Sequence, residues 1–145
     1  MRLAALYSLL LTSPALAMRQ AMPPAELCAQ TPLVVEAEVT GQQGMWDGPL
    51  IETHIDLHIH QVFKGPLDED SLSIVIPGGT ANGVTLSVSE AASLKNDHRY
   101  VLLLIPRPDG AWTLSGGPDG AFALTGKNAV PLSILSKRLE NCHVR

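Results

Sequence analysis

The segment LIETHIDLHIHQVF, residues 50–63, gives the strongest indication of the fold of this chain. Apolar and polar side chains alternate along most of its length, with one threonine among the apolar set. A period of two is typical of a strand that buries one face and exposes the other. The side chains expected to face inward are Ile51, Thr53, Ile55, Leu57 and Ile59, and those expected to face outward are Glu52, His54, Asp56, His58 and His60.

Apolar segments on both sides of this stretch predict further strands. Residues 33–40 alternate in the same way, and residues 99–105 contain a continuous apolar run that indicates a strand covered on both faces. Residues 41–48 begin and end with glycine, and we expect a turn or loop there. Other strands are expected at residues 71–76, 84–88, 111–114 and 121–124, and short helices at residues 25–30 and 131–139.

Tight turns, not helices, separate the predicted strands. The turn signals are Asn82-Gly83, Pro108-Asp109-Gly110 and Pro118-Asp119-Gly120. Without strand-helix-strand alternation a parallel sheet is not expected, and the remaining choices are an antiparallel barrel or a sandwich. The strand count favours an all-β fold with minor α: a small antiparallel barrel, OB-like, of six or seven short strands with short helices at both termini.

The composition is that of one small globular domain. The chain has 145 residues, of which 46% are hydrophobic and 17% charged, so a disordered chain is excluded. The net charge of −4 argues against a nucleic-acid partner, which would require a basic surface.

The first 17 residues have the pattern of a secretory signal peptide. Arg2 precedes an apolar run over residues 3–11, and Ala15-Leu16-Ala17 resembles a cleavage site. The alternative, an N-terminal core helix, would be broken early by Pro14. We therefore expect residues 1–17 to be removed and residues 18–145 to form a single exported domain, periplasmic or secreted. No later apolar run is long enough for a membrane span.

Export changes the interpretation of the two cysteines. In an oxidising compartment Cys28 and Cys142 can pair, and a disulfide between them would tie the two ends of the domain together. Such a bond stabilises a protein by about 2–4 kcal/mol. The alternative is a pair of free thiols.

The motifs of the chain follow a recognisable order: a strand at residues 33–39, Val62-Phe63-Lys64-Gly65, Ile76-Pro77-Gly78-Gly79, a strand at residues 100–104, and Gly117-x-x-Gly120-x-Phe122. This order resembles a loose group of uncharacterised exported bacterial domains, some of them associated with secreted proteases. The resemblance implies a β-barrel fold and no catalytic residues. A more distant similarity to netrin-like inhibitor barrels also exists, although the expected mature terminus, Met18, is not the cysteine through which metalloprotease inhibitors of that type act.

Three histidines on the outward face of the central strand are candidate metal ligands. His58 and His60 are two residues apart, which places their Cα atoms about 6.5–7 Å apart on one face. Zinc or copper would accept these imidazoles, with His54 or a residue of a neighbouring strand as a further ligand. The alternative is a solvated polar face without metal; no other cofactor is expected.

Two tryptophans are candidate contacts for a partner. Trp46 and Trp112 could be exposed anchors, although a tryptophan is more often a residue at the rim of the core.

No catalytic motif is present: the chain has no G-x-S-x-G, and its glycine-rich segments lack the lysine of a phosphate-binding loop. We therefore expect an exported non-enzymatic binding domain whose partner is another exported protein. A periplasmic metal-binding protein is the first alternative, and a hydrolase with a site assembled from separate loops is the second.

Overall fold

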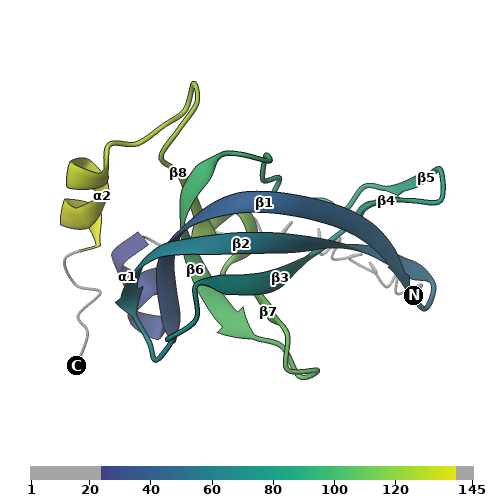
Figure 1. Ribbon diagram of the computed structural model, residues 1–145, viewed down its shortest axis with the longest axis horizontal. Coiled ribbons are helices and arrows are strands. Elements are labelled where there is room, and N and C mark those ends of the chain that lie inside the picture. Colours follow the sequence, from purple (N-terminus) through teal and green to yellow (C-terminus); the bar gives the residue numbers. More distant parts are fainter. Residues whose placement is uncertain (1–23, 140–145) are drawn as a thin grey trace, which may run out of the picture.

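The computed structural model describes residues 24–139 and contains eight strands and two short α-helices (Figure 1). In chain order the elements are α1 (Pro24–Gln30), β1 (Leu33–Asp47), β2 (Leu50–Lys64), β3 (Ser71–Pro77), β4 (Gly79–Ala81), β5 (Val84–Leu86), β6 (Arg99–Pro106), β7 (Trp112–Leu114), the 3₁₀ helix η1 (Gly117–Gly120), β8 (Ala121–Ala123) and α2 (Leu132–Arg138). The predicted signal peptide, residues 1–17, lies outside the described residues.

Five of the strands form a nearly closed ring. The main sheet has the order β1-β2-β3-β7-β6-β8, and a further pairing between β1 and β6 closes it. The shortest strand pairing of the ring is the joint between β3 and β7. Ile74 is registered there with Trp112, and the Thr113 hydroxyl donates to the carbonyl of Val75 at 2.7 Å. The prediction of a small all-β barrel with minor α is confirmed, although the described residues form eight strands, two of them 15 residues long, where six or seven short strands were expected.

One joint of the ring departs from the expected antiparallel pattern. β3 and β7 are parallel, whereas every other pairing of the described strands is antiparallel. A tight turn joins β6 to β7, so β7 runs antiparallel to β6 and therefore in the same direction as β3. A long segment connects β3 to β6. A connection of that length is what a parallel neighbour requires.

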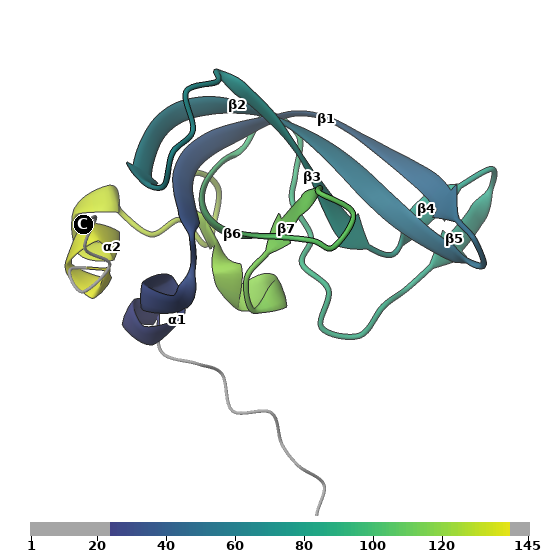
Figure 2. The ribbon, with the colours of Figure 1, turned by 90° about the horizontal axis from the view of Figure 1, so that it is seen from below.

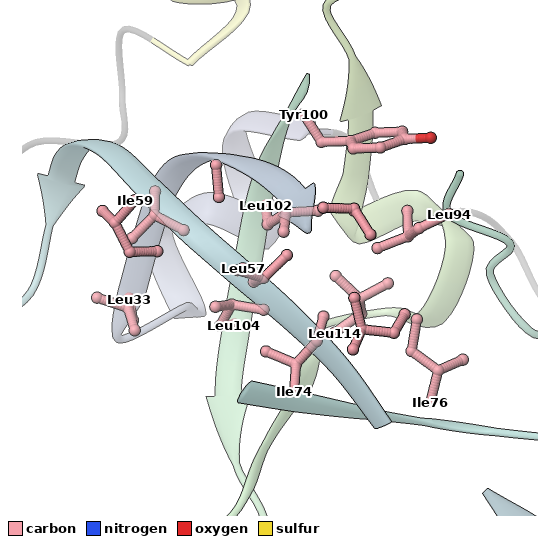
Figure 3. Packing of buried hydrophobic residues seen from close by; sticks show 14 residues of the cluster. Leu33, Leu57, Ile59, Ile74, Ile76, Leu94, Tyr100, Leu102, Leu104 and Leu114 are labelled. Carbon is pink, nitrogen blue, oxygen red and sulfur yellow. The ribbon is translucent and has the colours of Figure 1, made fainter. Parts of the chain in front are cut away.

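The interior of the ring holds the main hydrophobic core (Figure 3). The inward set predicted for β2 is found there: Ile55, Leu57 and Ile59 are buried, while Asp56, His58 and His60 are exposed. The period-two prediction for the central strand is therefore confirmed. The other buried members of this core are Leu33, Val35, Ala37, Val39, Ile74, Ile76, Leu94, Tyr100, Leu102, Leu104 and Leu114.

A second apolar layer covers part of the outside of the ring. The helices α1 and α2 lie at one end of the molecule (Figures 1 and 2), and Leu27, Cys28 and Leu135 from them pack against Val101 and Leu103 of β6. Strand β6 is thus buried on both faces, as its continuous apolar run predicted. Cys142 lies outside the described residues, so its pairing with Cys28 stays a prediction.

Residues 41–48 form no loop, and that prediction is wrong. β1 continues to Asp47, which is registered with Leu50 of β2. The glycines and glutamines of this segment are tolerated because β1 has left the core by this point and its side chains are mostly exposed. Two residues, Gly48 and Pro49, make the turn, and the positive φ of Gly48, 57°, is what a type II′ hairpin requires at this position.

The strands β4 and β5 form a small hairpin that lies against β1 and β2. Its turn is Asn82-Gly83, as predicted, and the φ angles of 51° and 78° are both positive, as a type I′ turn requires. We call residues 43–54 of β1 and β2, together with residues 79–86 of this hairpin, the arm. The arm projects from the end of the barrel opposite the helices (Figures 1 and 2).

Gly44 permits the close contact within the arm, and replacing it tests that packing. A Cβ atom at this position would overlap the carbonyl oxygen of Thr80 in β4, whereas a Cβ atom on Gly41 would meet only Asp56 Oδ2 at 3.9 Å. We expect Gly44→Ala to lower the free energy of unfolding by about 1–3 kcal/mol in urea denaturation, because backbone atoms must move apart. Gly41→Ala is the matched control and should change it little; equal effects of the two substitutions would contradict this packing.

Candidate functional site

The histidine face lies on the outside of the barrel, on β2. The rings of His58 and His60 meet edge to face with their centroids 5.0 Å apart. His60 Nε2 lies 3.3 Å from Glu38 Oε2 of β1. The structure therefore brings two of the three predicted histidines together and adds a carboxylate that the sequence did not single out.

The other polar groups of this face have partners of their own. Asp56 accepts a hydrogen bond from the Ser73 hydroxyl at 2.7 Å, and its carbonyl accepts one from Thr40 at 3.1 Å. His54 lies further along β2, registered with Gln43 and Val75. Between residues 24 and 139 no group of three or more His, Cys, Asp or Glu side chains could hold a metal ion. This geometry favours a solvated polar face.

The two tryptophans have different environments. Trp46 lies near the end of β1 and is 46% exposed, whereas Trp112 is partly buried and packs against the main core at the joint between β3 and β7. Trp112 thus has a structural place in the ring, and Trp46 has the exposure that a contact residue needs.

Other large apolar side chains of the arm are exposed besides Trp46. Met45 and Leu50 are 43% and 57% exposed, and Val84 on β5 is 48% exposed. The sequence does not single out Met45, Leu50 or Val84, because Met45 falls in the segment expected to be a loop, and Leu50 and Val84 begin segments expected to be strands. The signal that could have revealed the hairpin is the Gly48-Pro49 pair between two alternating segments.

The exposed residues of the tip lie on both faces of the β1–β2 ladder. Residues opposite one another in an antiparallel pair share a face. Trp46 is registered with Ile51, on the face that β4 and β5 cover. Met45 is registered with Glu52, on the other face, and Leu50 lies diagonally beside it.

An ion pair of Glu52 ties the arm to the barrel. Arg107, just after β6, donates to Glu52 Oε1 at 2.9 Å and lies 3.2 Å from Asp109 Oδ2. The hydrogen bond with Glu52 raises the pKa of Arg107 despite the opposing effect of burial, and the charges of Asp109 and Asp47 act in the same direction. The guanidinium therefore stays charged and holds β2 against the β6–β7 turn.

A cleft of about 400 Å³ lies between the arm and the segment at residues 85–94. Its walls contain hydroxyl and amide groups but no charged residue. The Gln42 amide in this wall donates to the carbonyl of Leu94 at 2.7 Å and thereby fixes the segment to β1. The cleft can hold a neutral ligand or a segment of a partner, and it supplies no side chain for acid–base chemistry.

No protein-family model matches this chain, and no curated protein is similar to it in sequence. The resemblance to exported bacterial domains therefore stays a prediction. None of the helices formed by residues 24–139 has the length and apolar character needed to cross a membrane.

The histidine face can be tested by calorimetry with zinc and copper. Because the described residues bring together two imidazoles without a full set of ligands, we expect no saturable heat at micromolar metal in the wild type. The paired substitution His58→Ala/His60→Ala is the control for adventitious binding. Micromolar binding that is lost in this variant would restore the metal hypothesis.

Proposed function

We propose that this protein is an exported, non-enzymatic interaction domain that binds another exported protein through the tip of its arm. The observation that carries the proposal is the exposure of four large apolar side chains within the arm, Met45, Trp46, Leu50 and Val84, each more than 40% exposed, on two hairpins that project from the barrel. Large apolar groups gathered on a surface mark an interaction site more often than chance exposure does.

Trp46 is the expected anchor of the contact. Tryptophan is enriched among the few residues that supply most of the binding energy of an interface, because its large ring can be fully desolvated by a partner. Met45 adds a flexible apolar side chain that adapts to the shape of a partner.

The apolar groups on both faces of the tip favour a partner with a groove over a partner with a flat surface. A flat surface would contact only one face of the tip. It would cover Trp46 alone, or it would cover Met45 and Leu50, and the other face would remain exposed to solvent.

The outer edge of β1 offers a second type of contact. β1 pairs with β6 over Leu33–Glu38, and among the described strands its residues 43–47 pair with β2 alone. An edge of this kind can accept a further strand from a partner.

The proposal also includes export and the Cys28–Cys142 disulfide. Cys28 is buried in the layer that joins α1 to α2, and the chain continues from α2 toward Cys142. A bond there would hold both terminal helices on the barrel, at the end away from the arm. An oxidising compartment would preserve such a bond.

Photo-crosslinking tests the arm as the contact surface. A benzophenone amino acid is placed at Leu50 or at Val84, with a control at Glu69, which is exposed on the barrel. We expect the two arm positions to give an adduct of one common partner in the exported fraction, and the control to give none. Adding Trp46→Ser should reduce the adduct by about tenfold or more, because an anchor residue is removed.

The unfolding midpoint of Trp46→Ser serves as the folding control and should lie close to that of the wild type, since the ring is half exposed. Adducts that persist unchanged in this variant, or that arise equally from Glu69, would contradict the proposal.

Intact-mass analysis of the exported protein, alkylated without reduction, tests export and the disulfide separately. We expect a mass that begins at Met18, because residues 1–17 have been cleaved, and no alkyl label, because the two cysteines are paired. A full-length chain would argue against signal cleavage. Two labels on the shorter chain would argue against the disulfide alone.

A further inference from the structure

A second cleft, of about 450 Å³, opens between the segment before β6 and the segment after β8. Three basic side chains line it: Lys95 and His98 on the first segment and Lys127 on the second. The rest of the lining is neutral and consists of Ser93, Tyr100, Ala123, Thr125, Gly126 and Asn128. A cleft with basic groups and no acidic group is distinctive in a chain whose net charge is −4.

The lysines of this cleft differ from Arg99, Arg107 and Lys64 in having no side-chain partner among the described residues. Arg99 donates to Glu36 and Arg107 to Glu52, while Lys64 donates to the last carbonyls of α1. Within residues 24–139 neither Lys95 nor Lys127 forms a salt bridge. Their charges are therefore available to a ligand.

Hydrogen bonds around the start of β6 hold both walls of the cleft in place. On one side, Val39 donates to the carbonyl of His98 at 3.1 Å, and the Asp97 N–H donates to Val39 at 2.8 Å. On the other side, the Arg99 N–H donates to the Thr125 hydroxyl at 3.1 Å. Walls held by the main chain lose little entropy when a ligand binds, which favours affinity.

Tyr100 supplies a polar group at the base of the cleft. This side chain is only 6% exposed, and its hydroxyl oxygen accepts a hydrogen bond from the Lys95 N–H at 2.9 Å. A tyrosine hydroxyl is both an acceptor and a donor, and no described residue accepts its proton. The hydroxyl can therefore donate to an anion that the lysines attract.

We propose that this cleft binds a small molecule carrying an oxyanion group, a carboxylate, phosphate or sulfate, which the ammonium groups of Lys95 and Lys127 contact from opposite walls. The volume falls within the range of small-molecule sites, about 300–1,000 Å³. The ring of Tyr100 and the methyl group of Ala123 offer apolar surface to the rest of an organic ligand. A long polyanion is disfavoured because the protein as a whole is negatively charged.

The test is a titration of the full mature domain, followed by ¹H–¹⁵N NMR at low ionic strength, with inorganic phosphate, acetate and benzoate as separate probes. We expect saturable shifts confined to the amides of residues 93–100 and 123–128. Each of Lys95→Gln and Lys127→Gln should weaken binding by about fivefold, which is the upper range for one exposed ion pair. Tighter binding of benzoate than of acetate identifies an organic anion as the ligand, and tighter binding of phosphate identifies an inorganic one.

Lys137→Gln is the matched control, because it removes the same charge from an exposed position on α2, away from the cleft. Its affinity for the probes should equal that of the wild type. Shifts that do not saturate with any probe would overturn the proposal, as would equal weakening by all three substitutions, which would indicate general charge attraction. Both cleft lysines are exposed, so neither substitution is expected to unfold the domain.

Discussion

The antiparallel ladder between β1 and β2 is the interaction on which the rest of this protein depends. The same two strands build part of the barrel at one end and the arm at the other. Register shifts in β1, the last of them between Val39 and Gly41, mark the change from one role to the other. Bulges of this kind bend a strand and increase its twist. The strands of the arm are therefore continuous with those of the barrel, which fixes the position of the exposed apolar residues of the arm.

Two apolar layers stabilise the barrel end of this ladder, where β1 pairs with β6. The ring interior packs one face of β6, and the terminal helices pack the other, through Val101 and Leu103. The ends of the described chain are thus part of the fold and not appendages to it. This arrangement leaves the opposite end of the barrel clear for the arm. The proposed disulfide would strengthen the helical layer without contacting the arm.

The two proposed binding surfaces differ in chemistry but share a segment of the chain. The arm offers apolar groups around Trp46, and the basic cleft offers Lys95 and Lys127. Ser93 lines both the neutral cleft beneath the arm and the basic cleft. The segment between β5 and β6 therefore forms one wall of each. Neither surface uses the histidine face, whose imidazoles and carboxylates are largely occupied with their strand neighbours.

The β-barrel class, the inward face of β2, the double burial of β6 and the turn at Asn82-Gly83 can all be predicted from the amino-acid sequence. Each of these depends on local patterns of side-chain polarity or on the backbone freedom of a glycine, which neighbouring residues reveal. Trp46 was also identifiable as a candidate contact. That Trp46 lies on an arm with Met45, Leu50 and Val84, and that Trp112 belongs to the ring, is visible only in the folded structure. It alone brought Lys95 and Lys127 to one cleft, because residues far apart in the chain meet only through the pairing of β6 with its neighbours, and no local pattern records that pairing.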